Sequence, residues 1–391
     1  MLYDFNFYSS LLLPAFLHGM LFALLFFVRS KKENNLSDQL MAWLLLINSL
    51  KVAYWMLGFA GWYDSHDAYT SFMFYFPFNN MVLVGPLLYF YFLSVTNHDF
   101  TFKKEHFPHV VLPVCWFLLI LVKFIVDFSF YSPFQDIDIT QYGTKGPYAD
   151  LDKTVFFVLL GYISFGYYIW LTMKAFRDYK SYIGQNFSDD TEINFNWLRN
   201  LIYAFCTGVL IFFIFQLCTT FLLTGKTYMF EWYAYFGLGI VIYYLSIAGY
   251  FSHSKVQKRL HFDPSTMEKS PSIKEFPEIE TWKSKLLTYM LEKRPYLDPE
   301  LTLSDLAKAL KTNVSVLSKV INDGTGQNFN DFINGYRVKT VISSLQEGKQ
   351  KLQSLLGIAY DSGFNSKATF NRSFKKITGI TPKEYLDGLK T

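Results

Sequence analysis

Five polar side chains near the C-terminus have the chemistry and spacing of a surface that contacts DNA. They are Lys367, Asn371, Arg372, Lys375 and Lys376, and helical geometry places them on one side of a predicted helix. The fork of Arg372 can bind guanine O6 and N7, and the amide of Asn371 can bind adenine N6 and N7. Lys375 and Lys376 suit phosphate oxygens, which supply affinity without sequence information. For Arg372, a phosphate contact or a structural ion pair is the alternative.

The element that must position these side chains is a helix-turn-helix. A short helix with apolar periodicity precedes Gly363, which tolerates φ > 0 and lets the chain leave at a sharp angle. Phe364 is expected to fill that angle. The second helix then places Phe370, Phe374 and Ile377 on one face, at i, i+4 and i+7. A polar, basic second helix of this kind fits the major groove of DNA.

This segment resembles the C-terminal DNA-binding domain of the AraC/XylS family of bacterial transcription regulators. The family domain has two such motifs joined by a long helix, and here they fall at about 299–329 and 353–385, with the joining helix at 330–345. The resemblance implies a tandem helix-turn-helix domain that binds double-stranded DNA. It is carried by Ile358, Ala359, Gly363, Phe364, Phe370, Phe374, Lys375, Lys376, Gly379, Thr381, Pro382 and Tyr385.

The resemblance also implies which side chains face DNA in each motif. In the first, Ser315, Ser318 and Lys319 match residues that face bases or phosphates, and a solvated helix charge is the alternative for Lys319. The chain departs from the family around this helix, because Lys311 stands where Gly is frequent and Ile321 where Phe is frequent. The base contacts of this motif therefore stay open. In the second motif, the base-facing positions are those of Lys367, Ala368, Asn371 and Arg372.

The rest of the chain has the composition of a membrane protein. Hydrophobic residues make up 51% of the 391 residues and charged residues 17%, below the roughly 25% of soluble domains. Residues 1–254 hold 14 Lys+Arg and 17 Asp+Glu, whereas residues 255–391 hold 22 and 15. A basic tail on an apolar body favours a polyanionic partner for the tail alone. Seven spans of about 20 residues are predicted, at 9–28, 39–61, 72–95, 108–128, 154–176, 198–222 and 232–251.

The Lys and Arg residues between the spans predict the orientation. Nine lie in the first, third and fifth connections, against three in the N-terminal tail and the even-numbered connections. The positive-inside rule then puts the N-terminus outside and the tail in the cytoplasm, at the inner membrane of a bacterial cell. We expect an all-α protein with a seven-helix transmembrane domain at 1–253, a linker at 254–280 that touches lipid head groups, and a DNA-binding domain at 281–391. The apolar stripe of residues 281–295 either forms a homodimer or packs on that domain.

Polar groups within the spans are candidates for sensing, because ionisable or amide groups in a bilayer are costly and usually functional. The candidates are Lys51, Asn79 and Asn80, and Lys123 and Asp127 are spaced to pair on one helix. No catalytic motif is visible, and we expect no enzyme activity, cofactor or metal. The sequence favours a membrane-anchored regulator that senses an unknown ligand or membrane partner. The alternatives are a transporter or membrane enzyme with an appended regulatory domain, and a regulator that its spans merely tether.

Overall fold

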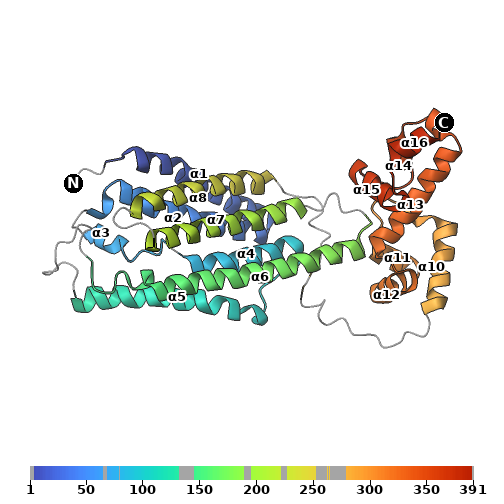
Figure 1. The fold of residues 1–391 in the computed structure, drawn as a ribbon. Coiled ribbons are helices and arrows are strands. Elements are labelled where there is room, and N and C mark those ends of the chain that lie inside the picture. Colours follow the sequence, from blue (N-terminus) through green and yellow to red (C-terminus); the bar gives the residue numbers. More distant parts are fainter. Residues whose placement is uncertain are drawn as a thin grey trace. The chain divides into compact units, whose positions relative to one another are not determined.

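The chain divides into two compact units of helices. A computed structural model describes residues 4–64, 68–78, 80–131, 145–188, 195–221, 227–251, 262, 264 and 279–389. The expected all-α class is confirmed (Figure 1). The predicted linker, residues 254–280, lies almost entirely outside the described residues. Unit 1 comprises Met1–Lys174, Asn194–His253 and Gln257–His261, and unit 2 comprises Ala175–Ile193, Ser254–Val256 and Phe262–Thr391.

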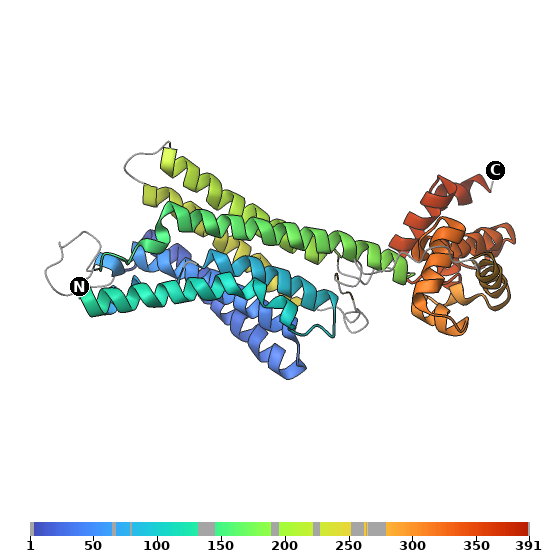
Figure 2. The same cartoon turned by 90° about the horizontal axis from the view of Figure 1, so that it is seen from below.

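Unit 1 is a bundle of apolar helices that run alongside one another (Figures 1 and 2). Many of their outward side chains are apolar: in the first helix, Leu17, Leu21 and Leu24 are more than half exposed. A helix that is apolar on all sides fits a lipid surrounding. The helices are α1 (Phe7–Glu33), α2 (Leu36–Phe59), α3 (Ala68–Met73), α4 (Met81–Thr96), α5 (Pro108–Val126), α6 (Val155–Asn186, of which the part from Ala175 belongs to unit 2), α7 (Phe195–Phe221) and α8 (Thr227–Phe251).

The third predicted span differs from the other six. Residues 72–95 do not form one helix: α3 ends at Met73, and α4 begins at Met81 and has 16 residues, about 24 Å. Pro77 lies in the break, where it cannot donate the N–H that a continuous helix needs. Within the described residues, six helical segments are long and apolar enough to cross a membrane: Phe7–Glu33, Leu36–Phe59, Pro108–Tyr131, Val155–Asn186, Trp197–Phe215 and Glu231–Phe251.

Polar contacts identify the two ends of the bundle. At one end the indole Nε1 of Trp232, early in α8, donates to the carbonyl oxygen of Tyr8, early in α1, over 3.0 Å. At the other end Arg29, late in α1, forms an ion pair with Asp38 at 2.6 Å and donates to the carbonyl oxygen of Tyr250, late in α8, over 2.7 Å. Helices α1 and α8 therefore run parallel, and the start of α1 and the end of α8 lie at opposite ends of the bundle.

Unit 2 holds a domain of short helices whose N-termini are capped by side chains. The side chains of Thr302, Asn313, Ser354, Ser366 and Thr381 each accept a backbone N–H of the helix that follows. Such caps satisfy donors that a short helix cannot pair internally. The helices are α10 (Ile279–Lys293), α11 (Leu303–Ala309), α12 (Val314–Thr325), α13 (Phe329–Gln346), α14 (Leu355–Asp361), α15 (Lys367–Thr378) and α16 (Pro382–Gly388).

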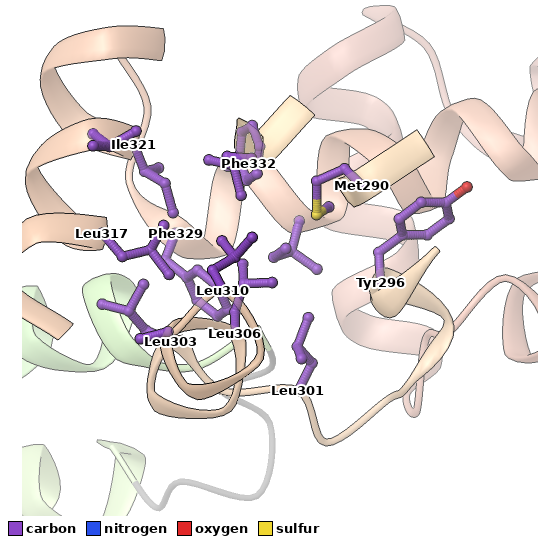
Figure 3. Packing of buried hydrophobic residues seen from close by; sticks show 14 residues of the cluster. Met290, Tyr296, Leu301, Leu303, Leu306, Leu310, Leu317, Ile321, Phe329 and Phe332 are labelled. Carbon is purple, nitrogen blue, oxygen red and sulfur yellow. The ribbon is translucent and has the colours of Figure 1, made fainter. Parts of the chain in front are cut away.

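Two buried clusters form the core of this domain, and both include residues of α13. The first joins α10, α11 and α12 to the start of α13, and its side chains converge between these helices (Figure 3). The second joins the rest of α13 to α14 and α15 through Phe370 and Phe374. Leu286 and Met290 of α10 are fully buried in the first cluster. Residues 281–295 thus pack on the domain, which was one of the two expectations for them.

Candidate nucleic-acid interface

The turn between α14 and α15 depends on a glycine, as the sequence predicts. Gly363 has φ +94°, a conformation that side chains with a Cβ rarely adopt. A Cβ at this position would also lie 2.2 Å from the carbonyl oxygen of Tyr296. Phe364 is buried directly after the turn and its ring packs 5.4 Å from that of Phe370. The second helix-turn-helix is therefore held by both backbone conformation and close packing.

Helix α15 presents the predicted polar face. Its buried residues are Thr369, Phe370, Ser373 and Phe374. Ile377 lies on the same face of the helix as Phe370 and Phe374, but its side chain is 46% exposed. It lies in the last turn, beyond Phe374, and the second core cluster does not extend to it. The predicted DNA-facing residues of this helix are all exposed: Lys367, Ala368, Asn371, Arg372, Lys375 and Lys376.

One of these cations already has a partner within the domain. The Nζ of Lys376 lies 2.7 Å from a carboxylate oxygen of Asp331, in the first turn of α13. Both side chains are exposed enough for solvent to screen the pair, so it contributes at most about 1 kcal/mol. A DNA phosphate could compete for Lys376, but Asp331 would then stand beside it as a like charge.

The first helix-turn-helix presents a smaller polar face. On α12, Ser315 is exposed, and Ser318 and Lys319 are half-buried. Ser318 Oγ accepts from the amide of Asn322 over 3.3 Å, within the same helix. Lys311, which precedes α12, has φ +57°, a left-handed conformation that disfavours residues other than glycine. The family resemblance implies Gly at this position, which adopts this conformation without strain, and in this chain a lysine adopts it.

Helix α13 connects the two motifs and contains a buried cation that the sequence analysis did not single out. Arg337 is 0% exposed. Its guanidinium donates to the carbonyl oxygens of Tyr296 and Asp298, over 2.8 and 2.7 Å, and to the amide oxygen of Asn334 over 3.3 Å. A buried charge is tolerated when such acceptors surround it. The sequence feature that could have indicated this buried cation is the position of Arg337 between the apolar Tyr336 and Val338 on a helix of the core.

The remaining acceptors of Arg337 come from the segment that follows α6. The guanidinium donates to Ser188 Oγ over 3.1 Å and to the Ser188 carbonyl oxygen over 3.4 Å. The amides of Asn330 and Asn334 also donate to this carbonyl oxygen, each over 3.1 Å. Phe187 adds an isolated β-bridge to Thr302, just before α11. Residues 187–188 are therefore an integral part of the DNA-binding unit, although about 100 residues separate them from it in sequence.

Among the predicted sensing residues, Lys51 lies at a small cavity inside the bundle. The cavity measures about 100 Å³, and Glu231 and Tyr235 of α8 also line it. The Nζ of Lys51 lies 4.4 Å from the centroid of the Phe212 ring, in a cation–π contact. An acid and a base from different helices thus border one internal space.

Asn80 is not among the residues that line this cavity. Asn79 lies outside the described residues. Asn80 is buried just before α4, and its amide donates to the carbonyl oxygen of Pro77. That bond satisfies a backbone acceptor in the break before α4, which is a local structural role.

The C-terminal domain has relatives among known regulators. Residues 306–388 match a family model described as "Helix-turn-helix domain". The TCP pilus virulence regulatory protein of Vibrio cholerae is 35% identical over 83 residues, which cover 21% of this chain and 29% of that protein. The uncharacterized HTH-type transcriptional regulator YtdP of Bacillus subtilis is 33% identical over 88 residues, 22% of this chain and 11% of its own. The matched part thus spans less than a third of these relatives' length. No solved structure matches the chain.

Proposed function

We propose that this transcription regulator, whose C-terminal domain is of the AraC/XylS helix-turn-helix type, is anchored in the bacterial inner membrane and reads specific DNA from the cytoplasmic side. The observation that carries the proposal is the exposed polar face of α15, set on a buried core by Phe370 and Phe374. Arg372 and Asn371 on that face have the donor and acceptor geometry for base edges, and Lys375 suits phosphate.

The two recognition helices are proposed to enter successive segments of the major groove. Helix α13 joins them and has 18 residues, about 27 Å at the rise of an α-helix. Groove segments on one face of the duplex repeat about every 34 Å. In this proposal side chains of α12 enter one segment and those of α15 the next, and Ser315 and Lys319 make the contacts of the first motif.

The membrane topology rests on two arguments that are independent of the DNA-binding domain. The start of α1 and the end of α8 lie at opposite ends of the apolar bundle, as the bonds from Trp232 to Tyr8 and from Arg29 to Tyr250 indicate. An odd number of crossings has this property, which favours a crossing role for α4 together with α3. The excess of Lys and Arg in the odd-numbered connections supports a cytoplasmic C-terminus.

A sensing role for the membrane domain is supported by the cavity between Lys51 and Glu231. Ionisable groups inside a transmembrane bundle cost free energy, and for that reason they usually mark functional sites. A homodimer through residues 281–295 is a weaker proposal, because Leu286 and Met290 are already used in the core. Leu291, which is 69% exposed, is the apolar residue of α10 that remains for a second copy.

Selection of binding sites from random DNA tests the proposal. The full-length protein, held in lipid nanodiscs, should enrich one motif with two half-sites about one helical turn apart. Binding should weaken steeply with salt, because phosphate contacts release counterions. Failure to enrich any sequence would overturn the assignment of α15 as a reading helix.

A further inference from the structure

A pocket of about 830 Å³ opens at the end of unit 1 where α2 ends and α6 begins. Five of its twelve lining residues are aromatic: Tyr54, Trp55 and Phe59 come from α2, and Tyr63 and Phe74 come from the segments that follow. Pockets of about 300–1,000 Å³ with apolar walls and a few polar groups are typical of sites for small molecules. The volume and the walls therefore fit one small organic molecule.

Two lysines bring positive charge to one side of this pocket. Lys145 and Lys153 both form ion pairs with the carboxylate of Asp150, the second at 2.8 Å. Lys153 also donates to the hydroxyl of Tyr54 over 3.1 Å. Two ammonium groups thus share one carboxylate. The lining also contains Asp64, so its two lysines and two aspartates balance formally. Within the described residues Asp64 forms no ion pair with either lysine, so the cluster of Lys145, Lys153 and Asp150 carries by itself one net positive charge beside the aromatic residues.

The segment that carries the two lysines is held by two buried groups, one in α5 and one in the turn that follows it. The Nζ of Lys123 donates to the carbonyl oxygen of Ala149 over 2.8 Å and forms an ion pair with Asp152. The fully buried carboxylate of Asp127, in the π-helical turn Asp127–Tyr131 that follows α5, accepts from the backbone N–H of Tyr148 over 3.1 Å. The spacing of Lys123 and Asp127 predicts that they pair with each other. That prediction is wrong for the described structure, where each has other partners. Both contact the segment before α6.

The same network leaves no room for another residue at Gly146. The hydroxyl of Tyr75 donates to Asp127 over 2.6 Å and accepts from the Gly146 N–H over 3.0 Å. A Cβ on Gly146 would lie 2.4 Å from Asp127 Cγ. The segment that carries Lys145 is thus fixed in place before any ligand arrives, and a preformed site loses little entropy on binding.

We propose that this pocket binds a small organic anion, a carboxylate or a phosphate with an apolar or aromatic body. The anionic group would lie on Lys145 and Lys153, and the body against Tyr54 and Trp55. The proposal rests on the sensing role proposed above and names the class of signal. The backbone N–H of Asp4 donates to the Ala60 carbonyl oxygen over 3.4 Å, so the pocket shares its end of the bundle with the N-terminus. In the proposed topology that end faces the outside.

Titration calorimetry on the full-length protein in nanodiscs tests this inference with three probes that share one body. They are 3-phenylpropionate, 3-phenylpropan-1-ol and 3-phenylpropan-1-amine. The anion should bind at least about ten-fold more tightly than the other two, which is the size expected of one charged hydrogen bond. Lys145→Met should abolish this preference and Lys145→Arg should keep it. Lys104→Met, at an exposed lysine outside the pocket lining, is the matched control and should also keep it.

Several results would overturn the inference. They are equal binding of the three probes, absence of binding at millimolar concentration, and an unchanged preference in Lys145→Met. A melting curve for each variant shows whether it is folded. DNA binding by the same preparations is measured in parallel. If DNA binding persists while the anion preference is absent, the pocket assignment fails and the proposed function stands. If DNA binding itself is absent, the proposed function fails.

Discussion

Arg372 and Phe374 lie two residues apart on α15 and face in nearly opposite directions, because two helical steps turn the chain by about 200°. Phe374 is 0% exposed, and Arg372 is exposed. The same short stretch therefore contains one residue that holds the motif and one that can read DNA. Substitutions at these two positions should separate the two roles.

Replacement of Arg372 by alanine should lower affinity for the selected operator by about 5- to 150-fold, the loss expected for one bidentate contact to guanine. It should also relax preference at one or two base pairs and leave the melting temperature unchanged. Phe374→Ala is the contrasting variant and should cost about 3–5 kcal/mol of unfolding free energy, because it removes a buried ring. The measurements are binding-site selection and a melting curve. An early-melting Arg372→Ala, or an equal loss for all sequences, would contradict base reading.

The ion pair between Lys376 and Asp331 gives a second prediction at this scale. If Lys376 turns to a phosphate, Asp331 stands beside DNA as a repelling charge. Asp331→Asn should then strengthen non-specific binding by a few-fold and change stability by less than about 1 kcal/mol, because the pair is exposed. Lys376→Ala should weaken binding to all sequences and reduce the salt slope by about one. Binding isotherms at several salt concentrations provide the test. Weaker binding by Asp331→Asn would show that the pair itself supports the DNA-binding surface.

At the scale of elements, α13 is fixed by hydrogen bonds from one buried arginine. Arg337 joins α13 to the segment after α10 and to Ser188 after α6, and all its described acceptors are oxygens of backbone or neutral side chains. Helix α6 begins in unit 1, two residues after Lys153, and its last turns belong to unit 2. The connector between the two recognition helices is therefore bonded directly to the segment that follows α6.

Replacement of Arg337 by methionine should destabilise α13, because it removes a donor from the buried carbonyl oxygen of Tyr296. The carbonyl oxygens of Ser188 and Asp298 keep other donors, from Asn330 and Asn334 and from the backbone N–H of Leu301. The expected cost is about 1–3 kcal/mol, the cost of one buried acceptor left unpaired, and the removal of a desolvated charge offsets part of it. Hydrogen exchange of the α13 amides in the full-length protein should become faster. Arg337→Lys, which keeps the charge without the fork, should give an intermediate effect. Unchanged exchange in Arg337→Met would mean that these bonds do not hold the helix.

Sequence patterns predicted the elements better than the contacts between them. Periodicity and turn residues identified α15, its Gly363 turn and its exposed polar face, because these depend on local geometry. The bonds of Arg337 to Ser188 could not be predicted, since backbone carbonyls have no sequence signature and the partners are far apart in the chain. Lys123 and Asp127 had the spacing of a helical ion pair, but they bond instead to Ala149 and Tyr148, in the segment before α6. Pro77 indicated a break between α3 and α4. The sequence did not indicate that this break shortens α4 to 16 residues.

At the scale of the whole molecule, the proposed topology makes a direct prediction. A reporter protein that folds only in the cytoplasm should be active when it is fused after Asn34 or after Leu260. It should be inactive when it is inserted at Gly143, because the fourth connection is predicted to face outside. Activity at Gly143 would contradict the orientation. Inactivity after Leu260 would instead indicate an even number of crossings, with the short helix α4 failing to cross.

The central claim is that a protein held in the membrane binds specific DNA through α15, and genome-wide DNA occupancy in the host tests it most directly. The full-length protein should be recovered in the membrane fraction and should occupy discrete sites that share the motif selected in vitro. Arg372→Ala should remain in the membrane at the same level and lose these sites. Identical occupancy by the two proteins, or an absence of discrete sites for a full-length protein that is present in the membrane, would contradict the account.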